Sequence, residues 1–228
     1  MRYHYDPIDF LGRYLFKIGR YPSVQKLKYN NVSLNLTVYS WHDILTLNEI
    51  FFRKDYPIDG NDKVIIDFGS NIGISAAYFL SASDKSFCYL FEPLPMNVSR
   101  LEKNLGGFDG RYKLERAAID LADGETNFGY EPTGRYGGIG LDTGSYITVP
   151  CLDVARVVKE KIDQHGQIDV LKIDIESREQ QIISAIPKSD WSKIKKVFVE
   201  YSFASNPLKE SHKYVQRGSV AQFAPRES

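Results

Sequence analysis

From residue 61 onward, short apolar runs alternate with segments of helical spacing, and this alternation constrains the fold more than any other feature. The run Lys63–Phe68 is almost continuously apolar, which is typical of a strand covered on both faces in a parallel sheet. Strands alternating with helices indicate βαβ units and an open, mostly parallel, Rossmann-like α/β sheet. The predicted strands are Lys63–Phe68, Phe87–Phe91, Tyr112–Ile119, Tyr146–Val149, Ile168–Ile175 and Lys196–Tyr201, with helices near Ala76–Leu80, Pro95–Leu105, Asp153–Ile162 and Arg178–Ile186.

The two ends of the chain lack this regular pattern. Residues 1–60 are rich in tyrosine and charge, although Val32–Val38 alternates like a half-buried strand and Trp41–Phe52 fits a short helix. We expect residues 1–60 to form an N-terminal cap on a core of residues 61–204. No strand pair is evident after Tyr201, so residues 205–228 are expected to form a weakly ordered or atypical tail.

Composition argues against several classes of function. The formal net charge of the 228 residues is +0, without the basic excess that phosphate binding usually requires, so no nucleic-acid partner is expected. The two cysteines and four histidines show neither a disulfide framework nor metal-ligand spacing. No run resembles a signal peptide or a membrane span, so a soluble, cytoplasmic protein is predicted.

A glycine-containing loop, Asp67–Gly73, follows the first buried strand and opens a helix. Ligands of open α/β sheets bind at the carboxyl ends of the strands, so a cofactor is expected here. Gly69 and Gly73 would let the backbone approach a ligand closely, although a tight turn would also use glycine. Asn71 stands where the dinucleotide fingerprint has its second glycine, which makes the loop less suited to a pyrophosphate.

Acidic residues end two further strands of the predicted sheet. Glu92 follows the second strand, where its two carboxylate oxygens could accept hydrogen bonds from both hydroxyls of a ribose. Asp174 and Glu176 follow the strand near Ile168–Ile175, where they could hold an ammonium group, orient a hydroxyl or accept its proton. Solvation, for Glu92, and capping of the next helix, for the other two, are the alternative interpretations.

Taken in order, Asp-Phe-Gly-Ser-Asn-Ile-Gly, Phe-Glu-Pro, Leu-Asp, Lys-Ile-Asp-Ile-Glu and Val-Glu resemble the FkbM-type methyltransferases. The resemblance runs from about Val32 to Tyr201, and it implies a class I methyltransferase fold that binds S-adenosylmethionine. It also implies a role for each motif. Glu92 would hold the ribose, Ala118 and Asp120 would lie near the adenine, and Asp174 and Glu176 would face the methyl group. The residues that would line the methionine side are Asp67, Gly69, Ser70, Asn71 and Gly73.

Two positions depart from the family pattern. Ser177 follows the Lys-Ile-Asp-Ile-Glu motif where the family usually has glycine, which predicts a change of backbone or of role there. Class I folds also end with an antiparallel strand pair, for which the sequence after Tyr201 gives no clear pattern.

The function predicted from these motifs is methyl transfer from S-adenosylmethionine to a hydroxyl of a small molecule or saccharide. Asp174 is favoured as the acid nearer the cofactor amine or acceptor, Glu176 is the acceptor-side alternative, and Glu200 and His42 are weaker candidates for a base. No metal is required, although the acidic pair could hold magnesium. The alternatives are a non-catalytic binding module and a nicotinamide-dependent oxidoreductase.

Overall fold

The computed structural model describes residues 6–226 and contains a seven-stranded sheet with the order β12-β13-β11-β10-β3-β4-β5. The strands from β11 to β5 are parallel, while β13 is antiparallel to both β11 and β12. This confirms the predicted open, mostly parallel α/β sheet. The strands are β3 (Val64–Phe68), β4 (Phe87–Phe91), β5 (Tyr112–Glu115), β10 (Ile168–Ile173), β11 (Ile194–Val199), β12 (His212–Arg217) and β13 (Val220–Pro225).

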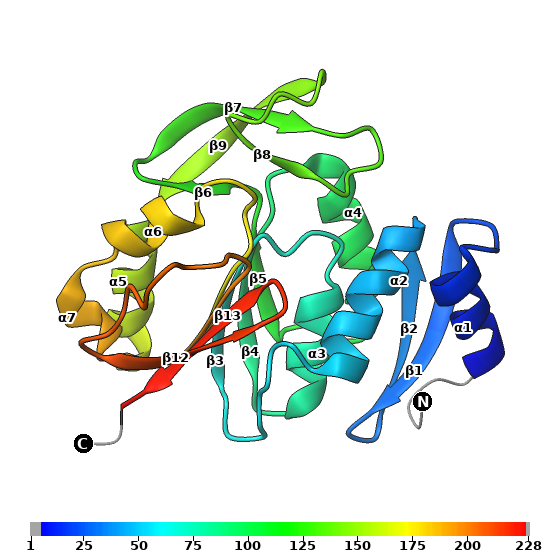
Figure 1. Ribbon diagram of the computed structural model, residues 1–228, viewed down its shortest axis with the longest axis horizontal. Coiled ribbons are helices and arrows are strands. Elements are labelled where there is room, and N and C mark those ends of the chain that lie inside the picture. Colours follow the sequence, from blue (N-terminus) through cyan, green and yellow to red (C-terminus); the bar gives the residue numbers. More distant parts are fainter. Residues whose placement is uncertain (1–5, 227–228) are drawn as a thin grey trace.

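Helices cover both faces of this sheet (Figure 1). Ile65 points into a core shared with α3 (Ile74–Ala82) and α4 (Pro95–Asn104), while its neighbour Ile66 points into a second core. Burial on both faces is the reason why these strands are apolar at successive positions. The second core is closed by α5 (Val154–His165), α6 (Glu179–Ala185) and α7 (Lys188–Trp191).

The N-terminal segment packs against α3 and α4 on one side of the molecule (Figure 1). The strand β2 and the helical stretch from Trp41 lie where the sequence predicts them, whereas α1 and β1 were not predicted. Asn104 of α4 joins the segment to the core, because its side chain accepts from Thr37 N at 2.8 Å and donates to Thr37 O at 3.1 Å. The elements are α1 (Pro7–Phe16), β1 (Ser23–Tyr29), β2 (Val32–Val38), α2 (Trp41–Leu47) and a π-helix, η1 (Asn48–Arg53).

A second, four-stranded sheet with the order β6-β9-β7-β8 lies beyond the carboxyl ends of the parallel strands (Figure 1). The single strand predicted over Tyr112–Ile119 is split, because the chain leaves the main sheet after β5 and enters the small sheet as β6. Its glycine-rich strands β7 and β8 have too little apolar pattern to be predicted. The members are β6 (Ala118–Asp120), β7 (Gly124–Tyr130), β8 (Gly137–Ile139) and β9 (Tyr146–Asp153).

The expectation of a weakly ordered tail without a strand pair is wrong for His212–Pro225. These residues form the β12–β13 hairpin, and β13 extends the main sheet by pairing with β11. The two-residue turn Gly218-Ser219, in which Gly218 has a φ of 57°, connects the strands, and Phe223 is buried beneath them. A glycine-serine pair between short strands is a known hairpin signal, which the polar, weakly alternating strand His212–Arg217 obscured. Residues 227–228 of the predicted tail lie outside the described residues.

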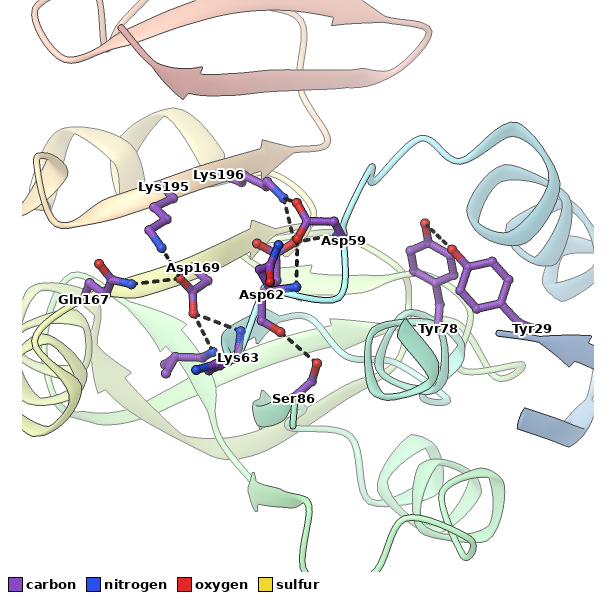
Figure 2. Close-up of polar contacts among 12 residues, drawn as sticks. Tyr29, Asp59, Asp62, Lys63, Tyr78, Ser86, Gln167, Asp169, Lys195 and Lys196 are labelled. Atoms are coloured by element: carbon purple, nitrogen blue, oxygen red, sulfur yellow. Dashed lines mark hydrogen bonds and ion pairs between the residues drawn. The ribbon is translucent and has the colours of Figure 1, made fainter. Parts of the chain in front are cut away.

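Paired charges close the amino end of the sheet, where the parallel strands begin (Figure 2). The buried carboxylate of Asp169 accepts from Lys63 N at 2.9 Å and Val64 N at 3.0 Å, and Lys195 Nζ lies 2.8 Å away. Burial opposes its ionisation, but Lys195 and the two backbone amides lower the pKa of Asp169 below its ordinary value. Lys196 Nζ similarly contacts Asp62 at 2.6 Å. The amino end therefore holds its buried charges in matched pairs.

Candidate functional site

The Asp67–Gly73 loop connects β3 to α3 at the carboxyl end of the sheet. Gly69 has a φ of 79°, and a Cβ at this position would lie 1.7 Å from the backbone oxygen of Asp174. Gly73 has a φ of 84°, and its Cβ would lie 3.1 Å from Leu101 Cγ of α4. The sequence interpretation reserved both glycines for a ligand, but close backbone packing in one case and helix packing in the other account for them.

Glu92 is held by this loop directly after β4. Its Oε2 accepts from Asn71 N and its Oε1 accepts from Leu94 N, both at 2.9 Å. Burial raises the pKa of Glu92 to about 7, although both backbone amides favour the charged form. The side chain of Asn97 also forms a hydrogen bond with Glu92. A carboxylate offers about four lone-pair sites, so Glu92 keeps acceptor capacity for about one further donor.

Lys172 is the only charged side chain of β10 that points into this end of the sheet among the residues described. Its Nζ lies 2.9 Å from Asp67 Oδ1 and 3.1 Å from Asp174 Oδ2, and it donates to Gly69 O at 3.0 Å. Burial alone would lower the pKa of Lys172, but Asp174 and Asp67 raise it above its ordinary value. Asp67 is itself fully buried and accepts from Ser75 Oγ at 2.6 Å. The sequence analysis missed Lys172, although a lysine inside a buried apolar strand is itself a signal of pairing.

Two further carboxyl groups, those of Glu176 and Glu200, line a cavity together with Asp174 at the carboxyl end of the sheet, and Glu200 shares a hydrogen bond with Asp174. Burial, followed by the charges of Asp174 and Glu179, raises the pKa of Glu176 to about 7. The charge of Asp174, followed by burial, raises the pKa of Glu200, directly after β11, to about 8. The cavity therefore concentrates more negative charge than its cations neutralise, which favours a cationic ligand or a proton.

The opposite wall of the cavity comes from segments outside the predicted motifs, where the sequence analysis named only His42, as a weaker candidate for a base. Glu49 of η1 lines it, and burial raises the pKa of this carboxyl group. Arg135 enters from the segment between β7 and β9 and places its Nη1 3.2 Å from His42 Nε2 of α2. Burial and the charge of Arg135 lower the pKa of His42, so the imidazole is neutral near pH 7. No spacing pattern in the sequence links these three residues.

Residues 131–145, which we call the flap, cross the mouth of the cavity and include β8. Asn71 Nδ2 donates to Arg135 O at 3.2 Å, and Asn97 Nδ2 donates to Gly134 O at 2.7 Å. Asn71 thus connects the glycine loop to the flap directly, in addition to its backbone bond with Glu92.

Most of the predicted site residues line this one cavity, but three do not. Asp67 lies beneath it as a partner of Lys172, Gly73 packs on α4, and Asp120 forms an ion pair with Arg178. Within residues 6–226, no group of three or more His, Cys, Asp or Glu side chains is arranged to hold a metal ion. The predicted residues that do line the cavity are Gly69, Ser70, Asn71, Glu92, Ala118, Asp174 and Glu176.

Known proteins resemble this chain both in sequence and in fold. A 2-O-methyltransferase, NoeI, from Sinorhizobium fredii is 37% identical over 67 residues, which cover 29% of this chain and 27% of NoeI. The hexuronic acid methyltransferase AglP from Haloferax volcanii is 26% identical over 128 residues, or 55% of this chain and 50% of AglP. The AMB antimetabolite synthetase AmbE from Pseudomonas aeruginosa is 24% identical over 206 residues, or 74% of this chain and 10% of AmbE. The chain thus spans half or less of each of these relatives.

Among solved structures, the methyltransferase FkbM from Methylobacillus flagellatus superposes with a TM-score of 0.50 at 13% identity, covering 78% of this chain and 47% of that one. At this identity the likeness shows the fold, which is that of the class I methyltransferases. No helix of residues 6–226 is long and apolar enough to cross a membrane.

The methyltransferase FkbM domain matches residues 67–217, which include every motif that carried the resemblance from Asp67 onward. Its methyl donor is S-adenosylmethionine, so the nicotinamide-dependent alternative does not hold. Because the match covers well over half of the chain, the protein belongs to the FkbM family of S-adenosylmethionine-dependent methyltransferases.

Proposed function

We propose that the protein transfers the methyl group of S-adenosylmethionine to a hydroxyl oxygen of a small molecule or saccharide. The observation that carries this proposal is the cluster of Asp174, Glu176 and Glu200 around one cavity. The names of NoeI and AglP support an oxygen and a sugar as acceptor. Because the chain spans only part of both, the acceptor remains a proposal for this protein.

The residues on the β3 and β4 side of the cavity fit the cofactor. Glu92 keeps lone pairs for ribose hydroxyls, and Phe91, Ala118 and Ile119 give an apolar surface suited to adenine. When bound, S-adenosylmethionine supplies a methyl group activated by a positively charged sulfonium. The excess of carboxylates in the cavity is complementary to that charge and to the ammonium group of the methionine moiety.

On the acceptor side we assign the role of base to Glu176. Asp174 is already engaged in an ion pair with Lys172 at 3.1 Å, which gives its carboxylate a structural role at the floor of the cavity. Glu176 has no Lys or Arg within 4.0 Å among residues 6–226, and its pKa of about 7 suits proton transfer near neutral pH. Glu176 would accept the proton of the hydroxyl, while Asp174 and Lys172 keep the floor of the cavity in place.

Methyl transfer from labelled S-adenosylmethionine to a panel of sugars and small hydroxyl compounds tests the proposal. With an active acceptor, Glu176→Gln should lower kcat by about 10²–10⁴-fold, while calorimetry shows cofactor affinity within about twofold of wild type. Glu160→Gln is a suitable control, because its exposed ion pair with Arg156 lies outside the cavity lining. Transfer only to nitrogen acceptors, or a normal kcat in Glu176→Gln, would contradict the proposal.

A further inference from the structure

Two consecutive residues other than glycine adopt positive φ directly beside the cavity. Glu176 has a φ of 56° and Ser177 a φ of 96°. Side chains rarely adopt such angles, and at 96° glycine is strongly favoured because it has no Cβ. A backbone of this kind persists only where surrounding contacts hold it, so those contacts identify what the conformation is for.

The contacts come from the flap strand β8. Ser177 Oγ donates to Ile139 O at 3.1 Å, and a Cβ on Gly138 would lie only 2.5 Å from Glu176 O. The backbone of β8 therefore rests directly on the Glu176–Ser177 turn. Among the residues that the structure describes, the serine hydroxyl makes the one side-chain hydrogen bond between that turn and β8, and glycine could not supply it.

The turn also decides where the carboxylate of Glu176 lies. An extended chain advances about 3.3 Å per residue, so continuing β10 would carry Glu176 past the end of the sheet and away from Asp174. Instead, the two left-handed residues end the extended path at once and lead into α6, and Asp174 and Glu176 line the same cavity. The charged groups that act on Glu176 there include the acids Asp174, Glu179 and Glu200 and the cations Arg135 and Lys172.

We propose that Ser177 is a positioning residue, whose hydroxyl bond to β8 holds the left-handed turn that keeps the Glu176 carboxylate in the cavity beside Asp174. This inference rests on the proposed function only for the use of Glu176 as a base. The placement of Glu176 by Ser177 can be tested without any acceptor.

Two variants separate the hydroxyl from the Cβ. Ser177→Ala removes the hydroxyl and keeps the Cβ at positive φ, whereas Ser177→Gly removes both. Ser177→Ala should lower the melting temperature by roughly 2–4 °C, and Ser177→Gly should unfold at a higher temperature than Ser177→Ala. If the hydroxyl positions Glu176, both variants should release its carboxylate, whatever their stability.

The pKa of the Glu176 carboxyl group reports its position and is measured by an NMR pH titration of protein with ¹³C-labelled glutamate carboxyl groups. The signal of Glu176 is identified by its absence in Glu176→Gln. In both Ser177 variants the pKa should fall by at least about one pH unit toward the ordinary glutamate value, since the carboxylate leaves its buried, acidic surroundings. Ser184→Ala is the control, because its hydroxyl bonds only within α6, to Gln180 O at 2.8 Å, and it should leave the titration unchanged.

The inference would be overturned if the pKa of Glu176 in Ser177→Gly equalled that of the wild type. It would also be overturned if the pKa of Glu176 changed with the melting temperature of each variant and not with the loss of the hydroxyl. Its failure is distinguishable from failure of the proposed function. A normal kcat in Glu176→Gln removes the base role from Glu176, while the titration of the Ser177 variants still reports whether Ser177 positions it.

Discussion

The amino and carboxyl ends of the main sheet differ in how their charged side chains are paired. At the amino end, Asp169 has Lys195 and two backbone amides, and Asp62 has Lys196 (Figure 2). At the carboxyl end, Asp67 and Asp174 share Lys172, and burial or neighbouring acids raise the pKa values of Glu92, Glu176 and Glu200. The amino end is arranged for stability, whereas the carboxyl end retains unfavourable charge that a cationic ligand can relieve.

The largest difference between the two ends should appear at two glycines with the same backbone angle. Gly69 at the carboxyl end has a φ of 79° and Gly166 at the amino end a φ of 80°, but only Gly69 faces a backbone oxygen within 4 Å. Gly69→Ala should cost more than about 4 kcal/mol or prevent folding, while Gly166→Ala should cost about 1–3 kcal/mol from its angle alone. Urea unfolding measures both. Equal losses would mean that the contact with Asp174 O relaxes easily.

Lysines at the two ends should differ next. Lys172→Met leaves the buried carboxylate of Asp67 and the partly exposed carboxylate of Asp174 without their cation, and should destabilise the fold by about 3–5 kcal/mol. Lys195→Met removes a half-exposed partner of Asp169 and should cost at most about 1 kcal/mol. Adding Asp67→Asn to Lys172→Met should recover part of the loss, because one unpaired charge disappears. A loss in Lys172→Met no greater than in Lys195→Met would show that the carboxyl end tolerates its charge.

Ligand affinity should respond to changes at one end only. Glu92→Ala removes a buried charged acceptor, and each hydrogen bond lost to a ribose hydroxyl is worth about 1.5–3 kcal/mol. Calorimetry with S-adenosylmethionine should therefore show affinity weakened by at least about tenfold. Asp169→Asn should change stability and leave the affinity intact. Unchanged binding in a folded Glu92→Ala protein would remove Glu92 from the cofactor site.

The smallest effect should be a difference in the pH range to which each end responds. A carboxyl group with a raised pKa binds more protons in the folded protein, so its contribution is complete below the unfolded pKa and is lost as pH rises through about 7 for Glu176 and about 8 for Glu200. Asp169 has a lowered pKa and acts with the opposite sign, at acidic pH. Between pH 6 and 9 the melting temperature of the ligand-free protein should fall by roughly 2–4 °C.

Glu92, whose pKa is also about 7, contributes to the same slope, so the double variant Glu176→Gln, Glu200→Gln should reduce the alkaline slope without removing it. Asp169→Asn should alter only the acid limb of the stability curve. An unchanged slope between pH 6 and 9 in the double variant would assign it to other groups.

The sequence predicted the parallel part of the sheet well, because strands such as Val64–Phe68 and Ile168–Ile173 are apolar on both faces and leave little ambiguity. It predicted the acids of the site for a related reason, since polar side chains at the ends of buried strands converge on one side of a parallel sheet. It missed the β12–β13 hairpin, whose strands are short and whose first strand, His212–Arg217, is mostly polar.

Apart from His42, the residues of the opposite wall of the cavity were not predicted, for a different reason. Glu49 of η1 and Arg135 of the flap were not predicted, and His42 of α2 was named only as a weaker candidate for a base. The approach of Glu49 and His42 to the cavity depends on how the N-terminal segment packs on α3 and α4. Such packing is set by the summed contacts of many side chains and has no local sequence signal. The close approach of Gly69 to the backbone oxygen of Asp174 was likewise not predicted, because a backbone oxygen of another segment is not visible in the spacing of residues.

The order of strands in the main sheet has a consequence for how the chain folds. The central strand β3 pairs with β10, and Val64 N donates to the side chain of Asp169, which is 105 residues further along the chain. This contact cannot form until both segments are present. Gln222 Nε2 donates to Asp55 O across a separation of 167 residues. Because closing such long loops costs entropy before any contact compensates it, we expect slow folding in which the middle of the sheet forms late during synthesis. The first half of the chain would then depend on the second for its stability, and a partly synthesised protein would expose its β3 edge to other chains.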